Sequence, residues 1–469
     1  MSALTPYDAT ELSLSRESFP ASAKQIVEQL QQAGFDAYIV GGGVRDLLLK
    51  KTPKDFDIAT NALPEEIKHT FASRCRIIGR RFRLAHVRVG RHIIEVATFR
   101  GPHQQQDSTA STTDADSSNN SPQHHESRRT SPPFRSERGS GRYRKPDTLP
   151  AGVMSSAGMV LRDNVYGTLD EDAVRRDFTI NALYYDPIQH QVLDFTQALT
   201  DIKTQTLRLI GDPEQRFRED PVRLLRAVRL SQKLNLTIAP ETLKPLSQLA
   251  PLLHHVSAAR LFDEVLKLFL SGHAVASFEG ILHHNFLSTL FPATAKLIEQ
   301  RPEILTLLKL VMRNTDARLA VNKPVTPAFL FAAFLWYPVL ERHQHILSNS
   351  KIAFFPALHQ ASEEILFEQS SITSIPKRFS RPMREIWELQ FRLPRRTRQR
   401  AMKLLQHPRF RAGYDLLLLR EEAKEIPEEL GPWWTDFQIA EPKKQRHMLN
   451  ALQNKKPAAA QQANPIVNT

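Results

Sequence analysis

The sequence predicts an α+β domain at its N-terminal end, followed by a longer part that is all helical. Two short apolar runs, residues 38–40 and 93–98, lie between polar or glycine-containing turns and are typical of buried strands. Beyond about residue 199 the apolar residues recur at helical spacing instead, as in the segment 256–272 with its serine cap and terminal glycine. A third kind of region, rich in arginine, lies near the C-terminus.

Composition restricts the class of protein. The 469 residues are enough for two to four domains with their own cores. Lys and Arg number 63 against 50 Asp and Glu, so the net charge of +13 favours a polyanionic partner, nucleic acid first. The single cysteine, Cys75, excludes an internal disulfide and a cysteine-rich zinc site, and it fits a reducing compartment. Because no stretch approaches 18 uncharged apolar residues, we expect a cytoplasmic protein without a membrane partner.

A glycine turn carries the first chemical signal. Gly41, Gly42 and Gly43 follow the strand predicted at 38–40. Such a turn lets backbone N–H groups approach a phosphate without an intervening Cβ atom. The residues from Val44 onward predict a helix whose positive end would face the same anion. The alternative is an ordinary glycine turn without a ligand.

Two acids follow at a spacing of two residues. If residues 55–58 form a strand, the carboxylates of Asp55 and Asp57 lie on one face and Phe56 and Ile58 on the other. Two adjacent carboxylates need a compensating cation, and hard oxygen ligands suit Mg²⁺ bound together with substrate phosphates. The alternative is an exposed acidic loop.

These two motifs together resemble a known family. G-G-x-V-R-D followed by D-F-D-I-A-T is similar to the signature of the class II nucleotidyltransferases, which comprise bacterial poly(A) polymerases and CCA-adding tRNA nucleotidyltransferases. The resemblance implies a polymerase-β-like nucleotidyltransferase head, two Mg²⁺ ions, ATP as a substrate, and metal binding by Asp55 and Asp57. It also implies a nucleotide-binding role for Gly42, Gly43, Arg45 and Asp46.

A further carboxylate is expected from the strand at 93–98. Glu95 is the one acid inside this apolar run, and a buried Glu needs a partner. In the superfamily a third carboxylate lies on a neighbouring strand, so the resemblance assigns Glu95 to the metal site. The alternative is an edge-strand Glu that faces water.

The segment 170–185 contains R-R-D-F-T-I-N-A, another motif of the family. By resemblance, Arg175, Arg176 and Asp177 face the sugar and phosphates of the nucleotide, and Asp177 is one of the essential catalytic acids. Asp177 could instead cap the helix that follows, and both roles are compatible because an N-cap lies at the anion-attracting end of a helix.

A basic helix is expected from residue 221. Pro221 is well placed for the first helical position, which makes Asp220 a natural N-cap. Arg223, Arg226 and Arg229 recur every third residue on one face. This pattern resembles the family motif E-D-x-x-R-x-x-R, in which the Asp and the first Arg read the edge of the base. We therefore assign Asp220, Arg223 and Arg226 to the nucleotide site.

Residues 377–411 contain 12 Lys or Arg and two Glu, interleaved with Trp387, Phe391 and Phe410. Phosphate neutralisation together with aromatic stacking is what a surface for single-stranded RNA requires. The alternative is a solvated helical face. The residues predicted to bind RNA are Arg395, Arg396, Arg398, Arg400 and Lys403.

The sequence thus predicts a nucleotidyltransferase head followed by an all-helical neck, body and C-terminal RNA-binding region. The expected boundaries are 18–198 for the head with a disordered insertion at 102–150, 199–273 for the neck, 274–372 for the body, 373–440 for the basic region and 441–469 for a disordered tail.

The expected function is template-independent addition of AMP from ATP to RNA 3′ ends, with RNA-processing or RNA-decay proteins as further partners. Two alternatives remain, a CCA-adding enzyme and a non-catalytic RNA-binding protein with an inactive head.

Overall fold

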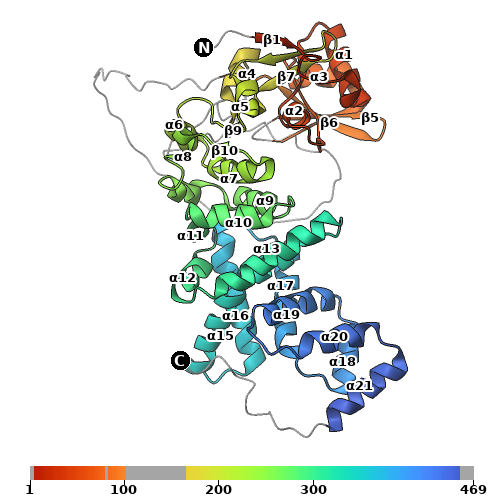
Figure 1. The fold of residues 1–469 in the computed structure, drawn as a ribbon, viewed down its shortest axis with the longest axis vertical. Helices are drawn as coiled ribbons and strands as arrows, with labels where there is room; N and C mark the ends of the chain where they lie inside the picture. The colour runs from red at the N-terminus through yellow and green to blue at the C-terminus, as the bar shows by residue number, and fades with distance from the viewer. Residues whose placement is uncertain (1–4, 80–82, 102–164, 455–469) are drawn as a thin grey trace, which may run out of the picture.

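The computed structural model describes residues 5–79, 83–101 and 165–454, which form an elongated molecule (Figure 1). A mixed sheet with its helices occupies one end, and helices make up the rest. The insertion predicted at 102–150 lies outside the described residues.

Eight strands form the sheet in the order β1-β8-β7-β2-β3-β6-β5-β4. All neighbouring strands are antiparallel except β3 and β6, which are parallel. The strands are β1 (Thr5–Asp8), β2 (Ala37–Val40), β3 (Asp57–Thr60), β4 (Cys75–Ile78), β5 (Leu84–Val89), β6 (His92–Thr98), β7 (Leu183–Asp186) and β8 (Gln191–Asp194).

The two faces of the sheet are covered differently. The helices of this part are α1 (Ala21–Gln32), α2 (Gly42–Leu48), α3 (Pro64–Phe71), α4 (Leu169–Arg175) and α5 (Ala198–Lys203). On one face, Ile58 and Val96 pack in a core with residues of α1 and α3. On the other, Ala59 packs with Ala173 of α4. Because side chains alternate along a strand, the residues next to Ile58 and Val96 lie on the second face.

The N-terminal residues are more ordered than the sequence indicates. The head was expected to begin at residue 18, whereas its sheet already includes residues 5–8. Strand β1 pairs with the edge of β8, where Tyr7 lies opposite Val192, and Phe19 stacks on Tyr185. Backbone pairing at a sheet edge requires no apolar run, so sequence periodicity does not reveal such a strand.

The remainder is helical apart from β9 (Thr206–Leu207) and β10 (Thr237–Ile238), which pair in parallel. Its helices are α6 (Pro213–Glu219), α7 (Val222–Leu234), α8 (Pro240–Leu243), α9 (Ala258–Phe269), α10 (Ala274–His283), α11 (Leu287–Leu290), α12 (Pro292–Gln300), α13 (Ile304–Ala320), α14 (Pro327–Phe334), α15 (Trp336–Asn349), α16 (Phe354–Ile372), α17 (Lys377–Arg392), α18 (Arg398–Leu405), α19 (Phe410–Glu422), α20 (Leu430–Ile439) and α21 (Pro442–Asn454). Several begin at a proline, whose missing N–H costs nothing at the first helical position.

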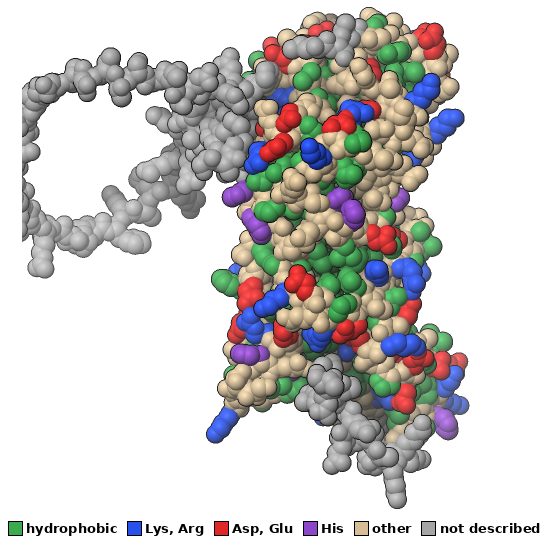
Figure 2. Space-filling model, turned by 60° about the vertical axis from the view of Figure 1, so that its left-hand side comes forward, with side chains coloured by type: hydrophobic (Ala, Val, Ile, Leu, Met, Phe, Trp, Pro, Cys, Tyr) green, Lys and Arg blue, Asp and Glu red, His purple; other side chains and the backbone are tan. Residues whose placement is uncertain are grey.

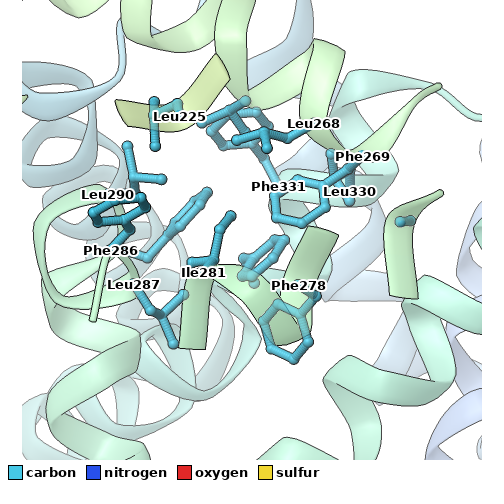
Figure 3. Packing of buried hydrophobic residues seen from close by; sticks show 14 of the residues in the cluster. Leu225, Leu268, Phe269, Phe278, Ile281, Phe286, Leu287, Leu290, Leu330 and Phe331 are labelled. Atoms are coloured by element: carbon cyan, nitrogen blue, oxygen red, sulfur yellow. The ribbon is translucent and has the colours of Figure 1, made fainter. Parts of the chain in front are cut away.

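One continuous core runs through most of the helical part. Figure 3 shows Phe269, Phe278 and Phe331 packed among leucine side chains of neighbouring helices. The same cluster extends from Phe178 to Leu419. The boundary expected between neck and body therefore does not separate two cores.

A second, smaller core joins α17 to α21. Trp434 and Phe437 are fully buried there, and Leu449 of α21 is only 3% exposed. The tail expected to be disordered from residue 441 is therefore helical over Pro442–Asn454. An apolar residue on one side of this otherwise polar helix is enough to attach it to the core. Residues 455–469 of the expected tail lie outside the described residues.

Figure 2 shows Lys and Arg side chains interspersed with Asp and Glu over the visible face, with hydrophobic side chains gathered near its middle. No helix in the described ranges combines the length and the apolar character needed to cross a membrane.

Candidate active site

The glycine turn connects β2 to α2. Gly41 has a φ of +70°, a conformation that glycine adopts without strain. Its N–H donates to the carbonyl oxygen of Leu183 at 3.1 Å, which fixes the turn to β7. Helix α2 begins at Gly42, so the helix expected from Val44 starts two residues earlier.

Gly43 allows the acidic segment to pass close to α2. A Cβ atom at this position would lie 2.7 Å from the ring of Phe56 and 3.1 Å from the carbonyl oxygen of Asp55. Both distances are shorter than normal van der Waals contacts, so only glycine fits. The glycine turn thereby determines where Asp55 lies.

The two acids of the D-F-D motif do not share a strand. Strand β3 begins at Asp57, and Asp55 precedes it. The expectation of one strand for residues 55–58 is therefore wrong for Asp55, because the close approach to α2 bends the backbone out of the sheet. Both side chains are exposed.

Asp57 lies beside Glu95 instead. The parallel pairing of Ile58 with Val96 brings the two preceding residues together on the same face of the sheet. Loss of hydration raises the pKa of Asp57 to about 6, and the negative charge of Glu95 adds to this shift. Glu95 accepts a contact from His86 at 3.3 Å and is half exposed. Its strand is internal, so the edge-strand alternative is wrong about the strand. The expectation of a buried Glu is also wrong, because the side chain is exposed to water.

These carboxylates fit a divalent cation. Among the described residues, no group of three or more His, Cys, Asp or Glu side chains is arranged to hold a metal ion. Mg²⁺, however, is usually held by one or two carboxylates together with substrate phosphates and water. Loss of hydration and the charge of Glu95 both raise the pKa of Asp57 and so disfavour its ionised form, an effect that a cation would offset. Asp57 and Glu95 are thus a suitable pair, with Asp55 nearby in the sequence.

Arg45 and Asp46, expected to bind the nucleotide, are bonded to each other. The Arg45 Nε donates to Asp46 Oδ1 at 2.8 Å, and its Nη1 donates to Asn181 Oδ1 at 2.5 Å. Both side chains are buried. In this structure the pair connects α2 to the segment 179–181 and presents no free charge.

Arg176 is also held inside the protein. Its guanidinium donates to Asp172 Oδ2 and to the Tyr184 hydroxyl at 3.0 and 2.9 Å. Although burial opposes it, the surrounding hydroxyl and carboxylate groups raise the pKa of Arg176 above its usual value. The preceding Arg175 ends α4 and is partly exposed. Arg216 of α6 donates to the carbonyl oxygens of both arginines at 2.6 and 2.5 Å.

Asp177 joins the sheet domain to the helical part. Its Oδ2 accepts from Arg226 Nε of α7 at 2.7 Å, and its Oδ1 accepts from Asn181 and from the Phe178 N–H. Burial alone would raise the pKa of Asp177, but the Arg226 charge and these bonds hold it well below its usual range. The carboxylate precedes a short 3-10 helix, Thr179–Asn181, so the capping alternative describes part of its role.

The two residues expected to read the base have other partners in this structure. Asp220 is not the N-cap of α7: it ends α6, and Pro221 takes the cap position. The Arg260 guanidinium of α9 binds both Asp220 oxygens, at 2.7 and 2.6 Å, and so draws the carboxylate away from α7. Arg223 donates to the Arg216 carbonyl oxygen at 2.7 Å.

Four arginines cluster on α6 and α7: Arg216, Arg223, Arg226 and Arg229. Burial, together with the charge of Arg223, lowers the pKa of Arg216 to about 10. Burial and the charge of Arg226 lower that of Arg229. In the described part of the chain the buried Nε atoms of Arg216 and Arg229 have no hydrogen-bond partner. This positive charge is only partly compensated, as in a site for an anion.

Sequence reasoning missed Arg216 and Arg260 as site residues. Both belong to arginine-containing helices, but their significance depends on contacts with residues about 40 positions away. No local pattern encodes such pairing.

The residues expected to bind RNA are divided between two environments. Arg395, Arg400 and Lys403 line a common pocket near α18. Arg396 lies over the ring of Trp433 at 5.2 Å, where burial lowers its pKa. The side chain of Arg398 lies outside the described residues.

The aromatic residues expected to stack on RNA do not do so in this structure. Trp387 is fully buried and donates from Nε1 to the Ala332 carbonyl oxygen at 2.9 Å. Phe410 is 6% exposed, and Phe391 packs against the main core. The expectation is wrong because these rings occupy the apolar side of amphipathic helices, where burial is more favourable than exposure.

Solved structures share the fold of this chain. The CCA-adding enzyme of Bacillus stearothermophilus in complex with CTP aligns with a TM-score of 0.51 and 24% identity over 92% of this chain and 82% of its own. A CCA-adding enzyme in complex with ATP aligns with a TM-score of 0.54 and 17% identity over 96% and 86%. The fold of this chain is therefore shared with these CCA-adding enzymes.

Sequence relatives identify the family. Poly(A) polymerase I of Salmonella typhimurium is 42% identical over 443 residues, which are 94% of this chain and 87% of the relative. That of Haemophilus influenzae is 39% identical over 96% and 91%. The CCA-adding enzyme of Lactobacillus helveticus is 32% identical over only 55% and 52%. The chain belongs to the poly(A) polymerase family.

Family models match three segments of the chain. The poly(A) polymerase head domain matches residues 37–208, and the arginine-rich C-terminus of polymerase A matches 350–466. The model described as the probable RNA- and SrmB-binding site of polymerase A matches 235–298.

The close contact at Gly43 leads to a prediction. Gly43→Ala should displace the segment that carries Asp55 and lower nucleotidyl transfer by about tenfold or more, because small misplacements of catalytic groups are costly. Primer extension and thermal unfolding measure the two effects. Gly42→Ala is the matched control for thermal unfolding, since its Cβ would lie at an ordinary contact distance of 3.4 Å from Arg45. Unchanged activity of Gly43→Ala would contradict the role assigned to Gly43.

The Asp177–Arg226 pair leads to a second prediction. Asp177→Asn should cost about 2 kcal/mol of stability at pH 7, because it removes a charge-assisted hydrogen bond from a partly buried pair. The pKa of Asp177 is lowered by folding from an ordinary 3.8, so the stabilisation is present above about pH 4 and disappears at lower pH. Urea unfolding across this pH range, combined with Arg226→Gln in a double-mutant cycle, measures it.

The exposed Arg218–Glu214 pair of α6 serves as the control for that cycle. Its coupling should be below about 1 kcal/mol, as for other exposed ion pairs. A coupling between Asp177 and Arg226 no larger than this would show that the pair does not hold the two parts together.

Proposed function

We propose that this protein transfers AMP from ATP to the 3′ ends of RNA without a template. The observation that carries the proposal is the 42% identity to Poly(A) polymerase I over 94% of the chain. The likeness to a CCA-adding enzyme covers about half of each chain and makes that activity the second candidate. A non-catalytic role is disfavoured because the acids and the glycine turn of the nucleotidyltransferase signature are intact.

Asp55, Asp57 and Glu95 would hold the divalent cations, for which we propose two Mg²⁺ ions. When bound, Mg²⁺ supplies Lewis-acid stabilisation of the attacking 3′ oxygen and of the leaving pyrophosphate. For this, Asp57 must be ionised, and with a pKa of about 6 it is mostly ionised at neutral pH. Gly43 keeps the Asp55 segment against α2, as described above.

The arginine cluster of α6 and α7 would bind the triphosphate. The two buried Nε atoms of Arg216 and Arg229 have no partner among the described residues and could donate to phosphate oxygens. We propose that Arg175, Arg176 and the glycine turn shape the same site, with Arg176 acting through Asp172 and Tyr184 as a positioning residue. Asp177 contributes by holding Arg226 in place.

Base selection is assigned to Asp220 and Arg223. Adenine has an amino donor next to a ring acceptor, which match a carboxylate and a guanidinium. Arg260 uses one lone pair on each Asp220 oxygen, and each oxygen retains another for the amino group. Arg223 would exchange its bond to the Arg216 carbonyl oxygen for the ring nitrogen.

The remaining assignments are also proposals. The basic residues near α18 would contact RNA, and RNA-processing proteins are possible further partners. We place the protein in the cytoplasm, where a lone buried thiol such as Cys75 stays reduced.

The direct test is primer extension with each nucleotide separately. Purified protein, labelled RNA and Mg²⁺ are incubated with ATP, CTP, GTP or UTP. Extension by many residues with ATP alone is the expected result. Addition of residues with CTP as well as with ATP would favour a CCA-adding enzyme, and no addition with any nucleotide would contradict catalysis.

Asp57→Asn should abolish AMP transfer by at least about a hundredfold and yet stabilise the fold. Because folding raises the pKa of Asp57 from 3.8 to about 6, its ionised form opposes folding above pH 6, and this cost vanishes as pH falls toward 4. The gain at pH 7.5 should be below about 1 kcal/mol, since the side chain is exposed to solvent.

Thermal unfolding with and without Mg²⁺ checks this prediction. Mg²⁺ should raise the melting temperature of the original protein more than that of Asp57→Asn. The same response in both proteins would contradict the metal-binding role of Asp57.

A further inference from the structure

A basic pocket lies where the start of α16, the end of α17 and α18 meet. Its volume is about 300 Å³. The pocket is lined by Phe355, Arg392, Arg395, Arg400, Lys403 and Leu404. Phe355 and Arg392 were not among the residues predicted to bind RNA, because they lie outside the segment 395–403.

The pocket carries positive charge that the protein does not neutralise. Arg392 forms an ion pair with Glu388 at 2.8 Å. Across the described ranges, Arg395, Arg400 and Lys403 have no ion pair, and no carboxylate lines the pocket. Arg400 and Lys403 lie three residues apart on α18 and therefore share one side of the helix. The pocket is thus suited to an anionic group.

The pocket also offers flat and apolar surfaces. The guanidinium groups of Arg392 and Arg395 lie 5.3 and 5.7 Å from the centre of the Phe355 ring. Leu404, which is 8% exposed, adds an apolar side chain. Nucleobases stack on aromatic rings and on guanidinium planes, so this part of the pocket suits a base.

We propose that the basic pocket binds one nucleotide unit of single-stranded RNA, with its phosphate between Arg395, Arg400 and Lys403 and its base against the Phe355 stack. A volume of about 300 Å³ is at the lower limit for ligand sites and suits one nucleotide. An acidic peptide would satisfy the charges but would leave the stacking surface unused.

The position of the pocket defines its role. Helix α18 and the strand β6 lie at opposite ends of the molecule (Figure 1). A nucleotide in the pocket therefore lies far from the reacting 3′ end and belongs to the upstream part of the same RNA. The pocket holds the RNA chain between additions, so it acts only on RNA long enough to reach from the catalytic carboxylates to α18. This role rests on the proposed function, whereas the binding itself does not.

The test uses the full-length protein with two sets of variants. Arg400→Gln with Lys403→Gln, and separately Phe355→Leu, change the pocket. Arg381→Gln of α17 and Phe367→Leu of α16 are the controls, since both side chains are 82% exposed and neither lines the pocket. Thermal unfolding establishes that all variants are folded.

Binding of long and short oligoadenylates is measured by fluorescence anisotropy at several salt concentrations. Each pocket variant should weaken binding of the long RNA by about tenfold, as for the loss of one stacked base. Loss of the one neutralised phosphate should make the logarithmic salt slope of the double variant shallower by about 0.7. The KM for long primers should rise, while the KM for ATP and for short primers stays constant, and both controls should resemble the original protein.

Unchanged affinity of the long RNA in the pocket variants would overturn the proposal. Displacement of the RNA by free ATP at equal phosphate concentration would also overturn it and identify a free-nucleotide site. Displacement by polyglutamate at equal carboxylate concentration would overturn it and identify a peptide site. If the protein does not transfer AMP but its RNA affinity still depends on Phe355 and Arg400, only the proposed function is contradicted. The assignment of the pocket to RNA then remains supported.

Discussion

The partly buried ion pair between Asp177 and Arg226 is the interaction on which the relation between the sheet and the helical part depends. Removing two charges from water is costly, and the cost is offset only when the geometry is good and the remaining polar atoms are bonded. Asn181 and the Phe178 N–H meet that condition for Asp177. Phe178 itself packs in the core of the helices, so polar and apolar contacts join the two parts at the same point.

This junction brings together charges that the fold alone does not neutralise. On the sheet, ionised Asp57 lies beside Glu95, and its pKa is raised. On the helices, Arg216 and Arg229 have lowered pKa values and unbonded nitrogen atoms within the described part of the chain. Each group destabilises the protein slightly by itself. The proposed substrate is a nucleoside triphosphate with its divalent cations. The cations would offset the negative charge of Asp57 and Glu95, and the phosphates would offset the positive charge of the arginines.

Local patterns in the sequence predicted the elements that depend on local forces. The strand before the glycine turn, the proline-initiated helices and the arginine stripe that includes Arg223 all follow from residue type and spacing. The partner of each charged side chain did not follow, because Asp220 meets Arg260 only after α9 has packed on α7. Glu95 was assigned through the family resemblance, and the parallel pairing of β3 with β6 supplies the physical reason for its position beside Asp57.

The basic C-terminal region shows why composition predicts a binding surface better than it predicts the binding residues. An amphipathic helix such as α17 directs its own aromatic residues into the core, since burying a ring gains more free energy than exposing it. Trp387, for example, is fully buried. Arg392 and Arg395 lie instead over a ring from a different helix. Phe355 of α16 supplies that ring, about 40 residues earlier in the chain. A stacking site on an arginine-rich helix is therefore a property of tertiary packing, and the spacing of aromatic residues within the basic segment cannot reveal it.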